Sequence, residues 1–103
     1  MILDIVESIN GVPIRLTDER WYEHIVNKRP RMSGYRQAVL DTVSDPEFIL
    51  RGTEGSKVAI LNTGRNQWLH VFYIELNQDD GFIISAYIKN SFNRNQIIWR
   101  REF

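Results

Sequence analysis

The predicted fold is built around the stretch Gly81–Ser91, where Ser85, Tyr87 and Lys89 alternate with Ala86 and Ile88 after an apolar start. Successive side chains of a strand point to opposite faces of the sheet, so the alternation predicts one apolar face and one face with polar groups. The apolar face holds Phe82, Ile84, Ala86 and Ile88, and the other holds Ile83, Ser85, Tyr87 and Lys89. The turn residues 77–81 and the run Trp68–Leu76 predict that this strand is the second arm of an antiparallel hairpin, central in a sheet.

The N-terminal segment predicts another hairpin. Ile2–Ile9 and Val12–Leu16 are strand-like and are separated by Asn10-Gly11, a pair that suits a tight two-residue turn because both residues accept positive φ. Pro13 has no amide hydrogen for a sheet ladder, so we expect Val12–Leu16 at a sheet edge. A structural role is expected for this segment.

Two helices follow the hairpin in the predicted order. Thr17 is placed to cap the first, whose apolar stripe contains Trp21, Tyr22, Ile25 and Val26, with His24 at its margin, and which ends before Pro30. The second covers 34–43, with apolar residues four positions apart, and stops before Pro46.

From Glu47 onward the pattern changes to short strands punctuated by glycine. These are Phe48–Leu50, Lys57–Leu61, Trp68–Leu76, Phe82–Asn90 and Ile97–Arg101. A hairpin and two helices followed by an antiparallel meander indicate an α+β fold, with the helices packed on a four- to five-stranded antiparallel sheet. A length of 103 residues suits a single domain spanning 1–103.

Charge and cysteine content narrow the class of protein. Thirteen basic and thirteen acidic residues leave no formal net charge, which counts against a nucleic-acid binder, although basic residues do cluster near Lys28 and Arg100. The absence of cysteine excludes disulfides and thiolate chemistry. Without a signal segment or a long apolar run, we expect a cytoplasmic protein with no membrane contact.

Two histidines are the first candidates for chemistry. His24 is a candidate general acid or base because an imidazole can take up or release a proton near neutral pH, but on periodicity alone an ordinary boundary residue is the more common interpretation. His70 alternates with Trp68 and Phe72 on an apolar strand face, so we expect a partly buried core histidine.

The polar face of the last long strand is the second candidate. Lys89 suits stabilisation of phosphorane charge, and Tyr87 suits a hydrogen bond or stacking on a base, whereas a simple solvated face explains the pattern equally well. Arg51, Arg65 and Arg94 are candidate phosphate ligands because a guanidinium binds phosphate with two hydrogen bonds. No phosphate loop, dinucleotide fingerprint, nucleophile elbow or cluster of metal ligands is found, so we expect neither a metal nor a cofactor.

Several short motifs are similar to one protein family. The motifs are Ile14-Arg-Leu-Thr-x-Glu-Arg-Trp-x-x-His-Ile25, Ala38-Val-Leu-x-Thr42 leading to Asp45-Pro46, Gly81-Phe-Ile-Ile-Ser-Ala-Tyr87 and the late Trp99. Together they resemble the phage and cyanobacterial branch of the barnase, EndoU, colicin and RelE-like nuclease superfamily. The resemblance runs from about Ile14 to Trp99 and implies a RelE-like fold, metal-independent RNA cleavage and a small antitoxin partner.

The resemblance also assigns residues. The family's helix histidine matches His24, its hydroxyl residue matches Ser85 and its aromatic residue matches Tyr87. The chain departs from the family at Arg29-Pro30-Arg31, which replaces a His-Pro-Glu-like triplet, and at Asn62 and Ile74, which replace common basic residues. It also reads Lys89-Asn90-Ser91 where the family tends to read Thr-Arg.

These observations lead to one predicted function and one alternative. The prediction is a toxin-type endoribonuclease with His24, Lys89, Tyr87 and Ser85 as catalytic residues and Arg51, Arg94 and Ser91 as substrate-binding residues. The alternative is a catalytically degenerate protein-interaction module on the same fold. Homodimerisation through the strand at Val12–Leu16 or Ile97–Arg101 is compatible with both.

Overall fold

Seven strands form one continuous sheet in the computed structural model, which describes residues 1–102. Their spatial order is β1-β2-β6-β5-β4-β3-β7. The strands are β1 (Ile2–Glu7), β2 (Pro13–Thr17), β3 (Phe48–Arg51), β4 (Lys57–Gly64), β5 (Gln67–Asn77), β6 (Asp80–Lys89) and β7 (Ile97–Arg100). The helical segments are η1 (Glu19–Val26), η2 (Pro30–Gly34), α1 (Arg36–Ser44) and η3 (Arg94–Gln96). The predicted α+β class is therefore confirmed.

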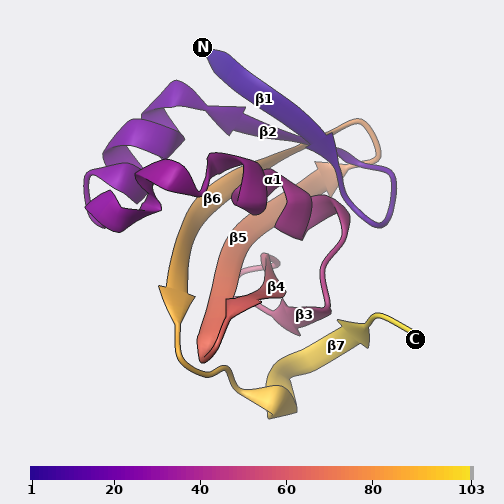
Figure 1. Cartoon of the computed structure of the whole chain (residues 1–103). Helices are drawn as coiled ribbons and strands as arrows, with labels where there is room; N and C mark the ends of the chain where they lie inside the picture. Colours follow the sequence, from indigo (N-terminus) through magenta and orange to yellow (C-terminus); the bar gives the residue numbers. More distant parts are fainter. Residues whose placement is uncertain (103) are drawn as a thin grey trace.

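The predicted four- to five-stranded antiparallel sheet is wrong in strand number and in direction. The N-terminal hairpin joins the sheet through β2, which runs parallel to β6, while β7 pairs with β3 at the other end (Figure 1). The alternation of apolar and polar residues along one strand does not specify which strand it pairs with, so neither the β2–β6 pairing nor the β3–β7 pairing could be predicted from it. Gly81 makes the β2 contact feasible, because a Cβ at this position would meet the Ile74 carbonyl oxygen and would lie 2.6 Å from Cδ1 of Ile14.

The N-terminal hairpin is confirmed, but its predicted turn and edge position are wrong. Residues 8–12 form a longer loop, closed by a 2.9 Å hydrogen bond from the Ser8 amide to the Val12 carbonyl, and of the pair Asn10-Gly11 only Gly11 has positive φ. β2 lies between β1 and β6, so the edge strand is β1. Pro13 is tolerated because it is the first residue of β2.

Both predicted helices are present, with small differences. In η1, a π-helix, the Asp18 and Thr17 side chains accept amide hydrogen bonds from Glu19 and Arg20, at 2.9 and 3.2 Å. Trp21 and Ile25 are buried as expected, but Tyr22 is exposed rather than part of the apolar stripe. The second helix, α1, begins at Arg36, two residues later than predicted, because Gly34 belongs to the 3₁₀ turn η2.

The main core lies between the helices and one face of the sheet. Figure 1 shows α1 in front of the strands, and it packs on β5, β4 and β1, while η1 packs on β6. Fully buried members of this core include Ile14, Leu16, Ile25, Met32, Val39, Val43, Ala59, Leu69, Val71, Tyr73, Ile83 and Ala86. The opposite face has a second, smaller apolar cluster around Leu50, Val58 and Ile60.

A bulge in β6 changes which residues share its faces. Phe72 pairs with Ser85 and Tyr73 pairs with Ile83, so Ile84 has no residue opposite it. Ile83 therefore lies in the main core with Ala86, and not on the face of Ser85 and Tyr87 as predicted. Phe82 pairs with Ile74 on β5 and with Arg15 on β2, and it lies on the face of Ser85, Tyr87 and Lys89 rather than on the predicted face of Ala86. Alternation predicts which residues share a face within each half of the strand. It does not predict that the bulge moves the residues before it to the opposite face.

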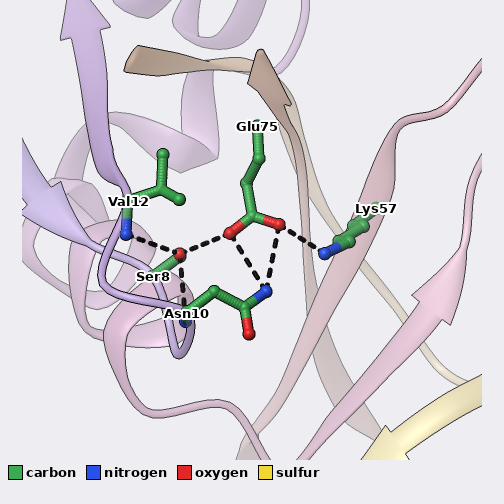
Figure 2. Close-up of polar contacts among 5 residues, drawn as sticks. All are labelled: Ser8, Asn10, Val12, Lys57 and Glu75. Atoms are coloured by element: carbon green, nitrogen blue, oxygen red, sulfur yellow. Dashed lines mark hydrogen bonds and ion pairs between the residues drawn. The ribbon is translucent and has the colours of Figure 1, made fainter. Parts of the chain in front are cut away.

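A cluster of hydrogen bonds around Glu75 holds the N-terminal hairpin against β5 and β4 (Figure 2). Ser8 Oγ donates to Glu75 Oε2 at 2.6 Å, Asn10 Nδ2 contacts both carboxylate oxygens at 3.2 Å, and Lys57 Nζ donates to Oε1. Ser8 Oγ also accepts the amide hydrogens of Asn10 and Val12 at 3.3 Å. These contacts fix the hairpin loop and so help to position β2 beside β6.

Candidate functional site

The sheet face opposite α1 is rich in aromatic rings, and we refer to it as the aromatic face. Its rings come from neighbouring strands and from the segment after β6, and they are Phe48, Trp68, His70, Phe72, Phe82, Tyr87 and Phe92. Register explains the grouping, because Trp68, His70 and Phe72 alternate along β5 on the side away from the buried Leu69 and Val71. The polar face predicted for β6 is therefore part of a larger aromatic surface.

Tyr87 lies at the centre of the arrangement on β6. Its ring stacks on the ring of His70, the residue opposite it on β5, with centroids 5.2 Å apart and planes 25° apart. The Arg29 guanidinium carbon and the Lys89 ammonium nitrogen each lie 4.9 Å from its centroid. Cations are attracted to the face of an aromatic ring, so Tyr87 holds two positive groups at the surface of a protein that has no formal net charge.

A second group of rings lies further along the aromatic face. Phe92 contacts Trp68 and Phe48, with centroids 4.9 and 5.2 Å apart. Arg94 lies over this group, 4.7 Å from the Phe92 centroid and 5.5 Å from that of Phe48. The Asn93 side chain accepts the Asn95 amide hydrogen at 3.0 Å and so fixes the short turn that carries Arg94. This places a third cation on the same face.

His70 is buried under these groups, as the sequence predicts, with 5% of its surface exposed. Its Nδ1 atom lies 2.8 Å from the Trp68 carbonyl oxygen, so this nitrogen carries the proton and donates it. Burial lowers the pKa of His70 below its usual value, and the nearby charge of Lys89 lowers it further. His70 is therefore neutral at neutral pH and supplies a flat support for Tyr87.

The predicted site residues are only partly brought together. Ser85, Tyr87 and Lys89 share the aromatic face, and Arg94 lies over it. Arg51 pairs with Lys57, which pairs with the core residue Tyr73, so Arg51 lies on the other side of the sheet. Ser91 is exposed in the segment that follows β6.

His24 is carried by η1, which packs against β6. Its Nε2 atom lies 3.6 Å from Glu19 Oε1, and its side chain is about one-third exposed. Arg20, four residues earlier and so about one helical turn away, has its guanidinium over Phe82 on the aromatic face. Arg29, just after η1, has its guanidinium over Tyr87. His24 thus lies in the chain between two residues that extend onto the aromatic face.

Two residues of the site were missed in the sequence. Arg29 appears there in a basic cluster and as a departure from the family's triplet but not as a site residue, and Phe92 was not considered. The alternation of Trp68, His70 and Phe72 was a usable signal, because aromatic residues on one strand face favour a stacking surface. Nothing local in the sequence indicated that Arg29 would contact Tyr87, since this contact depends on the packing of η1 against β6.

Within residues 1–102, one group of three potential metal ligands is found, Glu19, Glu23 and His24, whose ligand atoms lie within 4.8 Å of one another. Both glutamates are exposed, and exposed acidic groups of this kind are common without an ion. The arrangement therefore does not alter the expectation of metal-free chemistry, which stays a prediction. In the same residues, no helix is long and apolar enough to cross a membrane.

No protein-family model matches the chain, and no curated protein or solved structure matches it significantly. The resemblance to the RelE-like nuclease superfamily consequently stays a prediction that rests on the short motifs. Any function has to be inferred from the aromatic face itself.

Proposed function

We propose that this protein is a toxin-type, metal-independent endoribonuclease that binds RNA on its aromatic face. The observation that carries the proposal is that Arg29 and Lys89 both lie over the Tyr87 ring, each 4.9 Å from its centroid. Aromatic rings provide stacking surfaces for bases, and adjacent cations bind phosphates, so this pairing of groups suits a nucleic-acid strand. A local concentration of cations also answers the objection raised by the zero net charge.

In the proposed reaction, His24 accepts the proton of an RNA 2′-hydroxyl as the 2′-oxygen attacks the adjacent phosphorus. A new P–O bond forms and the bond to the 5′-oxygen breaks, and the leaving oxygen takes a proton from water. The products are a 2′,3′-cyclic phosphate and a 5′-hydroxyl. Lys89, Arg29 and Arg94 neutralise the charge that develops on the non-bridging oxygens, while Tyr87 and Ser85 orient the substrate.

A His24→Ala variant tests the enzymatic part of the proposal. We expect purified wild-type protein to cleave RNA in the presence of a chelator, and the variant to cleave it at least about 100-fold more slowly, because a positioned proton acceptor contributes 10² to 10⁴ in rate. Rates are measured with a labelled oligoribonucleotide on denaturing gels.

Glu23→Gln is the matched control, since it changes an exposed neighbour of His24 on the same helix and retains the imidazole, and it should cleave like the wild type. Thermal unfolding of each variant establishes that it folds. Equal cleavage by the wild type and His24→Ala would eliminate the assigned role of His24.

The second candidate is an interaction module that keeps the fold without catalysis. Two sheet edges favour it: Ile2 on β1 and Ile98 on β7 are each 48% exposed at strands with one unpaired side. A small antitoxin or a second copy of the chain is the proposed partner for such an edge. The predicted homodimer edge at Val12–Leu16 is wrong, because β2 is paired on both sides, whereas β7 remains available.

A further inference from the structure

A second ring on β6, Phe82, is flanked by cations in the same manner as Tyr87. The guanidinium carbon of Arg15 lies 5.8 Å from the Phe82 centroid and that of Arg20 lies 5.9 Å from it. Phe82 also forms the floor of a surface hollow of about 240 Å³, lined in addition by Arg15, Thr17, Glu19 and Arg20. None of the sequence motifs singled out this position for binding.

The two arginines at this hollow have different roles. Arg15 is fixed by Asp80, with Nε–Oδ1 and Nη2–Oδ2 distances of 2.8 and 3.0 Å, so its charge is largely matched. Arg20 forms no ion pair with the residues that the structure describes, and its charge is available to an anion. The Glu19 carboxylate at the rim provides an acceptor for the amino group of a base. The hollow therefore offers a ring for stacking, a cation for phosphate and an acceptor for a base edge.

Phe82 and Tyr87 lie on the same face of β6 because of the bulge at Ile84. The residues opposite them on β5, Ile74 and His70, are four positions apart, so the two positions on β6 are separated by about 13 Å at a rise of about 3.3 Å per residue. A base that lies on Phe82 or Tyr87 must leave its own base stack. The paired bases of a duplex do so only at the cost of unpairing, whereas the bases of a single strand are free to do so.

We infer that the substrate is a single-stranded RNA that lies lengthwise along β6, with one nucleotide at Tyr87 and another in the Phe82 hollow. This inference rests on the proposed function and adds a second subsite to it. Bases of a single strand can unstack and lie on aromatic side chains, whereas the bases of a duplex are hidden. Arg20 binds the phosphate next to the Phe82 subsite.

Binding of uncleavable oligonucleotides tests this second subsite. Fully 2′-O-methylated RNA cannot undergo the proposed attack, so wild-type protein can be titrated without turnover. We expect Phe82→Leu and Arg20→Gln each to weaken binding of a single strand of roughly 12 nucleotides about tenfold, in the range for loss of one stacked base, with little effect on one of roughly four nucleotides. Fluorescence anisotropy measures both affinities.

Salt titration and a control variant sharpen the test. Arg20→Gln should reduce the slope of log K against log salt by about 0.7, the value for one phosphate contact on a single strand. Arg51→Gln is the matched control, because Arg51 lies on the other side of the sheet, and it should bind like the wild type. Thermal unfolding shows whether Phe82→Leu folds. If Phe82→Leu does not fold, Arg20→Gln still tests the subsite, because it changes a single side chain at the rim of the fold.

The outcomes separate this inference from the proposed function. If the wild type binds no RNA, both are overturned. If Tyr87→Leu weakens binding but Phe82→Leu and Arg20→Gln do not, RNA binding stands and the second subsite is overturned. Equal binding of duplex and single strand would exclude the lengthwise arrangement, and equal competition by polyglutamate would indicate an acidic protein as the partner instead.

Discussion

At the scale of single residues, Glu75 is the most informative group outside the aromatic face. Its carboxylate contacts Lys57, Ser8 and Asn10, which belong to β4 and the hairpin loop. Burial acts to raise the pKa of Glu75, but the hydrogen bonds from these three residues outweigh it, so the pKa lies below its usual value. The ionised carboxylate therefore stabilises the folded state.

This lowered pKa predicts an acid-sensitive contribution to stability. The contribution is present above the unfolded-state pKa, about 4.3 for glutamate, and is lost as the pH falls through the lower folded-state pKa. We expect the difference in unfolding free energy between the wild type and Glu75→Gln to shrink as the pH is lowered from about 6 to about 3. Urea denaturation at several pH values measures this difference.

The same comparison removes other acidic groups from consideration. Asp80 and Asp18 also have pKa values below the usual range, through hydrogen bonds from Arg15 and from the N-terminal amine respectively. Both are present in the wild type and in Glu75→Gln, so their effects cancel in the difference. A difference that does not change with pH would contradict the assigned role of the Glu75 cluster.

At the scale of elements, the contact between β2 and β6 depends on Gly81. A methyl group there would overlap the Ile74 carbonyl oxygen and Cδ1 of the buried Ile14. We expect Gly81→Ala to lower the unfolding free energy by about 1–3 kcal/mol, the usual cost of an overpacked site. Chemical denaturation measures the loss.

Gly34→Ala is the matched control for this prediction. A Cβ at Gly34 meets nothing within 4 Å, and its φ is not in the left-handed region. The change should alter stability by no more than about 0.5 kcal/mol. Equal stability of the two variants would mean that β2 does not approach β6 as closely as described.

Local sequence patterns predicted the individual elements but not how the strands pair. Hydrophobic spacing located both helices and all seven strands, because each pattern reflects burial of one face of one element. It did not locate the bulge at Ile84, which has no sequence signature in an apolar run. It could not specify the parallel pairing of β2 with β6, because that choice depends on contacts between residues as distant as Ile14 and Gly81.

At the scale of the whole molecule, the sequence predicted the site residues that share one strand but not those that come from other elements. Ser85, Tyr87 and Lys89 were predicted to share a face because they alternate along one strand. Arg29 joins them only through the packing of η1 on β6, and Arg51 is separated from them by the alternation of β3. A site built across elements therefore requires the tertiary structure, even where its central strand is clear in the sequence.

The interaction-module candidate makes a prediction about the two ends of the sheet. If β7 pairs with a second copy of the chain, the wild type should have the molar mass of a dimer, and Ile98→Lys should be monomeric, because an edge lysine opposes strand pairing. Light scattering over a range of concentrations measures the molar mass.

Ile2→Lys is the control at the opposite edge, since Ile2 is exposed to the same extent as Ile98. It should leave the dimer unchanged. A monomeric wild type at every concentration would remove homodimerisation through β7 from consideration.

The pairing of early strands with late ones affects when the aromatic face can form during synthesis. β2 pairs with β6, and β3 pairs with β7, so strands made early must wait for partners made much later. The ribosome makes the chain from its N-terminus, and long-range strand pairing is slow to form. Tyr87 and Lys89 lie on β6, which is made after β1 to β5. A growing chain therefore lacks the aromatic face until β6 has been made, and the proposed nuclease cannot cut the messenger that encodes it before that point.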